Sequence, residues 1–192
     1  MSWWSTVRSV GDALGVFKPK AAPIGCVLGR TIYAETKRSA QIVNILRPRR
    51  PLDAAMVARL AALFPELDVS TIAVKTRCRL PSNKFQESGS VYAMTFGSTI
   101  YWRDELDTGN PSDLVKLIHE IVHVDQVRRL GGEAEFACAY GRGYLAGGGT
   151  LPAYIDDPTA YHRNPLEAEA YTFESQFRDA QGKAVAALLP NG

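Results

Sequence analysis

The sequence lacks any run of about 18 consecutive apolar residues, so no segment of it is expected to cross a bilayer. It also lacks a strong excess of charge of either sign. Its 22 basic and 20 acidic residues give a formal net charge of +2, which is too small to indicate a nucleic-acid-binding surface. The composition therefore predicts neither a membrane-spanning protein nor a partner of nucleic acid.

Cysteine is scarce, with Cys26, Cys78 and Cys138 as the three examples among 192 residues. Because their number is odd and they lie far apart, we expect three thiols rather than a disulfide framework, and thiols are typical of a reducing compartment. A secretory signal is lacking too, since charged residues and glycines interrupt the apolar residues from Trp3 to Phe17. We expect a cytoplasmic protein, or one that is exported without a cleavable signal peptide.

Hydrophobic residues make up 46% of the sequence, which is enough for one well-buried core. We predict a single domain over residues 24–192, preceded by an N-terminal amphipathic segment and linker over residues 1–23. The apolar residues of that segment recur at spacings of four and three, as on one face of a helix: Trp3, Val7, Val10, Leu14 and Phe17. Such a helix packs either on its own core or on a protein partner or membrane surface, and both readings stay open.

Helix and strand signals together predict an α+β fold with a short, mostly antiparallel sheet. Asp53 and Asn110 are suitable N-caps, and Gly131 follows the second helix as a stop signal. The predicted helices cover residues 54–64, 113–130 and 133–144, and a last one runs from Asn164 towards Leu189. The predicted strands cover residues 69–75, 91–96 and 98–102, the last two forming a hairpin around Gly97. Residues 24–46 show no clear period.

Histidine is as scarce as cysteine, yet two of the three histidines stand four residues apart in His119-Glu120-Ile121-Val122-His123. On a helix this spacing places both imidazoles on one side, where they can bind the same metal ion. Glu120 lies beside the pair, where its carboxylate can act as a general base on metal-bound water. The pattern predicts a catalytic zinc (Zn²⁺) site. The alternative is a pair of histidines that only satisfy local hydrogen bonds.

A catalytic zinc ion normally has three protein ligands, so a third donor must come from elsewhere in the chain. Arg129 stands where a metzincin would have its third histidine, which excludes that class. Glu167 is the best candidate, although Asn164 three residues earlier also fits a capping box that would use the same carboxylate. Glu169 lies about 160° away around the helix, so at most one of the two glutamates faces the ion. The remaining donor candidates are His162 and Cys78.

Two segments resemble the gluzincin class of zinc metallopeptidases: LIHEIVHVDQ at residues 117–126 and NPLEAEAY at residues 164–171. In that class a glutamate on a following helix completes the zinc ligands, in several families within a Glu-x-x-Ala motif. The resemblance therefore implies that Glu167 joins the two histidines as the third ligand.

A narrower resemblance covers about residues 51–129 and includes AMTFGSTIYW at residues 93–102. It is to the metallopeptidase core domain of proteins associated with extracellular contractile injection systems. Those domains more often have a threonine and a Gln-Gln pair around the second histidine, where this chain has Val122 and Asp125-Gln126.

These signals predict a zinc-dependent hydrolase, a metallopeptidase that cleaves a peptide or protein substrate with Glu120 as general base. The resemblance to gluzincins also implies that the substrate backbone lies along the strand region 92–102. Tyr161, His162 and Tyr171 are candidates for donating a hydrogen bond to a developing oxyanion, and the favoured alternative for each is a surface or packing role.

Two alternatives to the peptidase stay open. A zinc-stabilised scaffold or effector domain, with latent or lost activity, would have the same ligands. A peptide deformylase would add a cysteine upstream of the histidine helix, but Cys78 lacks the preceding Glu-Gly of that family.

Overall fold

The computed structural model describes residues 23–80, 91–149 and 158–179. Within these ranges it contains six α-helices, one short 3-10 helix and a four-stranded mixed sheet, which confirms the α+β class. The N-terminal amphipathic segment and the far end of the last predicted helix lie outside the described residues. In the part that the structure describes, no helix is both long and apolar enough to span a membrane.

The helices are, in chain order, α2 (Pro23–Val43), α3 (Ala54–Leu63), α4 (Pro111–Leu130), α5 (Glu133–Ala146), α6 (Pro158–Arg163) and α7 (Pro165–Asp179). The strands are β1 (Arg50–Pro51), β2 (Ala73–Lys75), β3 (Ala93–Phe96) and β4 (Thr99–Trp102), and the 3-10 helix η1 spans Val69–Thr71. The predicted caps are confirmed. Asp53 accepts a hydrogen bond from the backbone N–H of Met56, and Asn110 accepts one from Ser112. Gly131 ends α4 with a left-handed φ of 91°.

The sheet has the strand order β1-β2-β4-β3, with antiparallel pairs at both ends and a parallel pair in the middle. β3 and β4 form the predicted hairpin around Gly97, whose φ of 60° favours glycine. The strand predicted over residues 69–75 is correct only for β2. Asp68 accepts a hydrogen bond from the Ser70 N–H and caps a 3-10 turn there instead. Among the described residues β3 pairs with β4 alone, so its outer edge carries no further strand.

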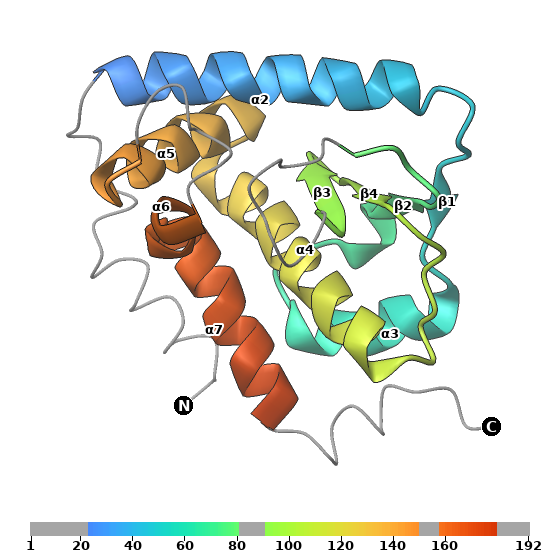
Figure 1. The fold of residues 1–192 in the computed structure, drawn as a ribbon. Helices are drawn as coiled ribbons and strands as arrows, with labels where there is room; N and C mark the ends of the chain where they lie inside the picture. The colour runs from blue at the N-terminus through green and yellow to red at the C-terminus, as the bar shows by residue number, and fades with distance from the viewer. Residues whose placement is uncertain (1–22, 81–90, 150–157, 180–192) are drawn as a thin grey trace.

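The main apolar core lies around α4. Its residues Leu114, Leu117, Ile118 and Ile121 are fully buried against the sheet, α3 and α7. Figure 1 shows α4 in the middle of the molecule, with the sheet and α3 on one side and α7 on the other. His119 and His123, opposite the apolar stripe of α4, are buried as well, the first against Tyr171 of α7 and the second against Phe136 of α5.

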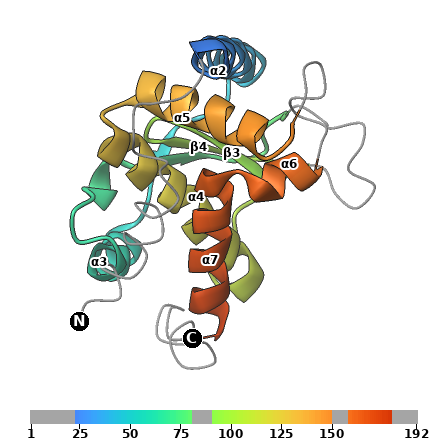
Figure 2. The same ribbon diagram turned by 90° about the vertical axis from the view of Figure 1, so that its left-hand side faces the viewer.

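Most of the stretch that showed no clear period forms one long helix, α2, which lies across α5 (Figures 1 and 2). The two helices approach closely at glycines. A Cβ atom on Gly29 would collide with the carbonyl oxygen of Ala137, and one on Gly141 would collide with that of Gly25. Glycine lowers helix propensity, so packing against α5 supports α2 where its local preference is weak.

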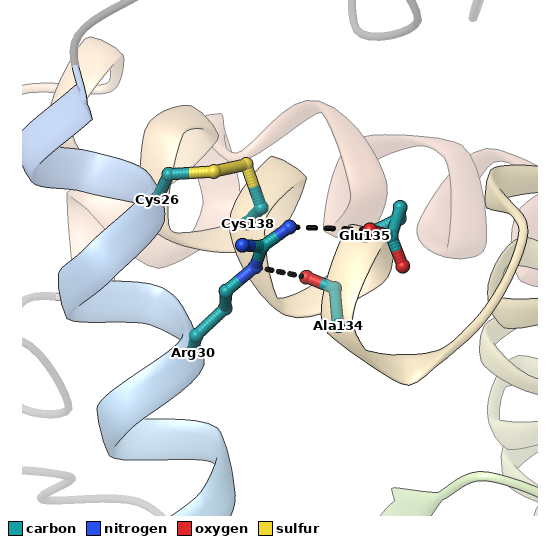
Figure 3. Close-up of a disulfide and its surroundings, with 5 residues drawn as sticks. All are labelled: Cys26, Arg30, Ala134, Glu135 and Cys138. Atoms are coloured by element: carbon teal, nitrogen blue, oxygen red, sulfur yellow. Dashed lines mark hydrogen bonds and ion pairs between the residues drawn. A yellow bond between two sulfur atoms is a disulfide. The ribbon is translucent and has the colours of Figure 1, made fainter.

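The prediction of three thiols is wrong, because Cys26 of α2 and Cys138 of α5 form a disulfide (Figure 3). The two cysteines are 112 residues apart in sequence and meet where the glycines bring the helices together. Next to them, Nε of Arg30 donates a hydrogen bond of 3.0 Å to the carbonyl oxygen of Ala134. Cys78 is a free, buried cysteine. The argument for a reducing compartment therefore loses its support.

Candidate metal centre

Three residues that were predicted as ligands lie together between α4 and α7. His119 and His123 stand one turn apart on α4, and their Nε2 atoms are 3.2 Å apart. Glu167, in the first turn of α7, places Oε2 3.4 Å from Nε2 of His119 and Oε1 3.6 Å from Nε2 of His123. All three side chains are buried, and together they could hold a metal ion.

The capping box that competed for Glu167 does not form. The backbone N–H of Asn164 donates to the carbonyl oxygen of Tyr161 at 3.0 Å, and not to the Glu167 carboxylate. The side chain of Asn164 still caps α7, since its Oδ1 accepts from the Leu166 N–H at 3.2 Å. Oε1 of Glu167 instead accepts a hydrogen bond of 2.7 Å from the hydroxyl of Tyr140 on α5. The carboxylate is thereby directed towards the histidines.

Burial and charge oppose each other in this cluster. Burial disfavours the charged form of His119, but the nearby carboxylates of Glu167 and Glu174 outweigh it and raise its pKa to about 10. The pKa of His123 is also raised, because the Glu167 carboxylate outweighs burial there as well. Burial would raise the pKa of Glu167, yet the two histidines hold it well below its usual range. The site thus favours positive charge at its centre.

The chemistry of the donor set fits a cation. Oε2 of Glu167 is buried and, among the described residues, accepts no hydrogen bond of good geometry. A buried carboxylate oxygen without a donor is costly unless a positive charge compensates it. Two imidazole nitrogens and one carboxylate suit a divalent transition-metal ion, which would replace protons on the histidines.

Both histidines are oriented by second partners through their other ring nitrogen. Nδ1 of His119 lies 3.2 Å from Oε2 of Glu174 on α7, and Nδ1 of His123 lies 2.8 Å from Oε1 of Gln126. Such contacts fix the ring and the tautomer of a metal-binding histidine. Sequence reasoning missed both partners. The available signal was position, since Gln126 follows His123 by three residues and Glu174 follows Glu167 by seven, each on the same helix face.

Glu169 takes no part in the metal group, as its position around the helix predicted. Its carboxylate pairs with Arg129 of α4 and accepts a hydrogen bond of 3.0 Å from Nε2 of Gln126. Gln126 also donates to the carbonyl oxygen of Leu166 at 2.9 Å. This buried network ties α7 to α4 in the register that brings Glu167 to the histidines.

Glu120 lies next to the group of potential ligands without belonging to it. Its Oε2 accepts a hydrogen bond of 2.6 Å from Oγ1 of Thr95 on β3. This contact holds the carboxylate at the side of the site, which is where a general base for bound water belongs.

A cleft of about 520 Å³ opens over the site. Its border includes His119, Glu120, His123 and Glu167 and extends along β3. Tyr161, His162 and Tyr171 border the same cleft. Burial first, and then the Glu167 carboxylate, raise the pKa of Tyr171 to about 12. The same two causes raise the pKa of Tyr161 well above its usual value. Both phenols are therefore neutral hydrogen-bond donors at neutral pH.

The two weaker donor candidates stand apart from the metal group. His162 borders the cleft but is exposed and outside the group. Cys78 is buried in a separate apolar cluster with Phe96 and Tyr101.

Comparison with known proteins gives one family. No curated protein and no solved structure matches the chain significantly. A family model does match, over less than half of the chain. Residues 51–131 match the eCIS core domain. This span contains α3, strands β2 to β4, and α4 with His119, Glu120 and His123. It ends before Glu167.

Proposed function

We propose that this protein is a zinc-dependent metallopeptidase of the gluzincin kind. One observation carries the proposal: the buried side chains of His119, His123 and Glu167 converge beside Glu120 at the base of a cleft. Two imidazoles and one carboxylate are a common ligand set of catalytic zinc, which leaves a fourth position for water. The match to the eCIS core domain is compatible with this activity but does not itself assign it.

A bound zinc ion would acidify its water and polarise the scissile carbonyl group. Glu120 accepts a proton from the attacking water as the new carbon–oxygen bond forms. It returns that proton to the leaving amine as the carbon–nitrogen bond breaks. Thr95 engages one oxygen of the Glu120 carboxylate and thereby limits its rotation. Tyr161 and Tyr171, as neutral phenols that border the cleft, would donate hydrogen bonds to the oxyanion.

The substrate backbone would lie along β3, whose residues Ala93 to Phe96 border the cleft. Within the described part of the chain the outer edge of β3 is not paired, so its backbone groups can bind an extended peptide.

The scaffold alternative has the same metal ligands and differs only in turnover. It gives no role to Glu120 or to a cleft that reaches the metal site, which is why we favour the peptidase. The deformylase alternative gains no support, because Cys78 lies in the separate apolar cluster.

Replacement of the general base tests the proposal. Glu120→Gln removes the basic carboxylate and leaves all three ligands, so we expect full zinc content and a rate lower by about 10²–10⁴-fold. The rate is measured on a quenched-fluorescence peptide library and the zinc content by elemental analysis. Glu35→Gln, an exposed glutamate on α2, is the matched control and should equal the wild type.

Hydrolysis that persists in Glu120→Gln at the wild-type rate would reject the mechanism. A zinc-loaded wild type that cleaves no member of a broad library would favour the scaffold.

A further inference from the structure

The helix α2 is fixed against the rest of the molecule by more than the disulfide. The hydroxyl of Tyr33 donates to Glu133 at 2.8 Å and accepts from the backbone N–H of Gly97 at 3.1 Å. Nζ of Lys37 forms an ion pair of 2.6 Å with the same glutamate. These contacts join α2 to the start of α5 and to the β3–β4 turn. The inner face of α2 therefore has a defined position relative to β3.

That inner face forms one wall of the cleft over the metal site. The residues that border the cleft from α2 and α5 are Gly29, Ile32, Tyr33, Thr36, Phe136, Ala137 and Tyr140. None of these described residues is charged, and most are apolar or aromatic. The charged residues of the cleft outside the ligand set, Lys116, Glu120 and Glu174, belong to α4 and α7. The α2–α5 end of the cleft is thus its apolar end.

The apolar end begins directly at the metal ligands. The ring of Phe136 lies 6.0 Å from that of His123 and 6.0 Å from that of Tyr33, so aromatic side chains lead from the ligand to α2. Tyr140, in the same wall, donates its hydroxyl to Glu167. A group bound at the metal is therefore within one side chain's length of this wall.

We propose that α2 and α5 form a specificity subsite that accepts a large apolar or aromatic side chain of the substrate residue next to the scissile bond. The inference rests on the proposed peptidase function. It adds to that function a substrate class, peptides with such a residue at the cleavage site. It also assigns a role to α2, which lies outside the span that matches the eCIS core domain.

Binding of zinc-chelating probes tests the subsite independently of turnover. Hydroxamates bind zinc through their two oxygens and so place a neighbouring side chain beside the metal. N-acetylamino-acid hydroxamates and 2-substituted succinyl hydroxamates present that side chain on either side of the scissile bond. In one of the two series, probes with a benzyl or isobutyl side chain should bind the zinc-loaded full chain at least about tenfold tighter than probes with hydrogen or carboxymethyl in its place. The measurement is isothermal titration calorimetry.

A variant in the wall makes the test specific. Ile32→Phe fills the subsite from α2, so it should weaken the benzyl probe by about tenfold or more and leave the unsubstituted probe unchanged. Ile42→Phe is the matched control. It lies on the same helix but is 60% exposed and does not border the cleft, so it should change neither probe.

The outcomes separate the two proposals. If the protein cleaves peptides but the carboxymethyl or unsubstituted probe binds as tightly as the benzyl probe in both series, the subsite is rejected and the peptidase stands. The same follows if Ile32→Phe changes nothing. If the apolar probes bind selectively but no peptide is cleaved, the peptidase is rejected and the apolar site remains. Failure of every hydroxamate to bind the zinc-loaded chain rejects both.

Discussion

At the scale of single residues, Glu167 decides whether two histidines become a metal site. Its carboxylate is buried, lies within 3.6 Å of both Nε2 atoms and has one oxygen without a well-formed hydrogen bond among the described residues. A glutamine at this position would have the same shape and could still form hydrogen bonds, but it would lack the negative charge that compensates a dication there.

Glu167→Gln should therefore weaken zinc binding by more than about 100-fold, because it removes an anionic ligand and not only an outer partner. Competition with a chromophoric chelator measures the dissociation constant. Glu174→Gln, which alters the partner of the His119 ring, should cost about 10–100-fold. An affinity for zinc that is equal in Glu167→Gln and wild type would remove Glu167 from the ligand set.

The residues of the site differ in how far the sequence alone could predict them. His119, Glu120 and His123 follow from local helix spacing. Glu167 could not be chosen by spacing, since Asn164 offered it an equally good role in a capping box. Thr95 could not be predicted at all. Its contact with Glu120 depends on how β3 packs beside α4, which no local pattern contains.

At the scale of elements, helices with strong end signals were predicted and the others were not. The N-cap Asn110 and the stop at Gly131 defined α4 almost to the residue. The α2 helix showed no clear period because apolar residues also lie on its exposed side, among them Ile24, Val27 and Ile42. Its glycines, which allow the close approach to α5, also weaken its local helix preference. The short helix α6, which precedes α7, was not among the predicted helices. It packs against α5 and α7, so its place in the fold depends on tertiary contacts.

The disulfide gives α2 a testable contribution to stability. Replacing both partners, Cys26→Ser with Cys138→Ser, removes a link across 112 residues and should lower the free energy of unfolding by about 2–5 kcal/mol. Urea unfolding of oxidised wild type and of the double variant measures the difference. Reductant should bring the wild type to the midpoint of the double variant and leave the variant itself unchanged. Equal midpoints for the oxidised wild type and the variant would mean that the disulfide does not stabilise the fold.

At the scale of the whole molecule, the candidate metal centre combines residues from inside and outside the span that matches the eCIS core domain. Residues 51–131 provide strands β2 to β4, the paired histidines and Glu120, whereas the third ligand comes from α7. The walls that would select a substrate come from α2 and α5. Buried contacts such as Gln126 with Glu169 hold α7 in the register that the ligand set needs. The proposed activity is therefore a property of the complete arrangement and not of the matched span alone.

The most direct test of this arrangement is the anomalous scattering of a zinc-loaded crystal, measured on both sides of the zinc absorption edge. We predict one strong anomalous peak, about 2.0–2.1 Å from the Nε2 atoms of His119 and His123 and about 2.0–2.2 Å from a carboxylate oxygen of Glu167. A zinc peak elsewhere, or none at these three side chains under saturating zinc, would contradict the account.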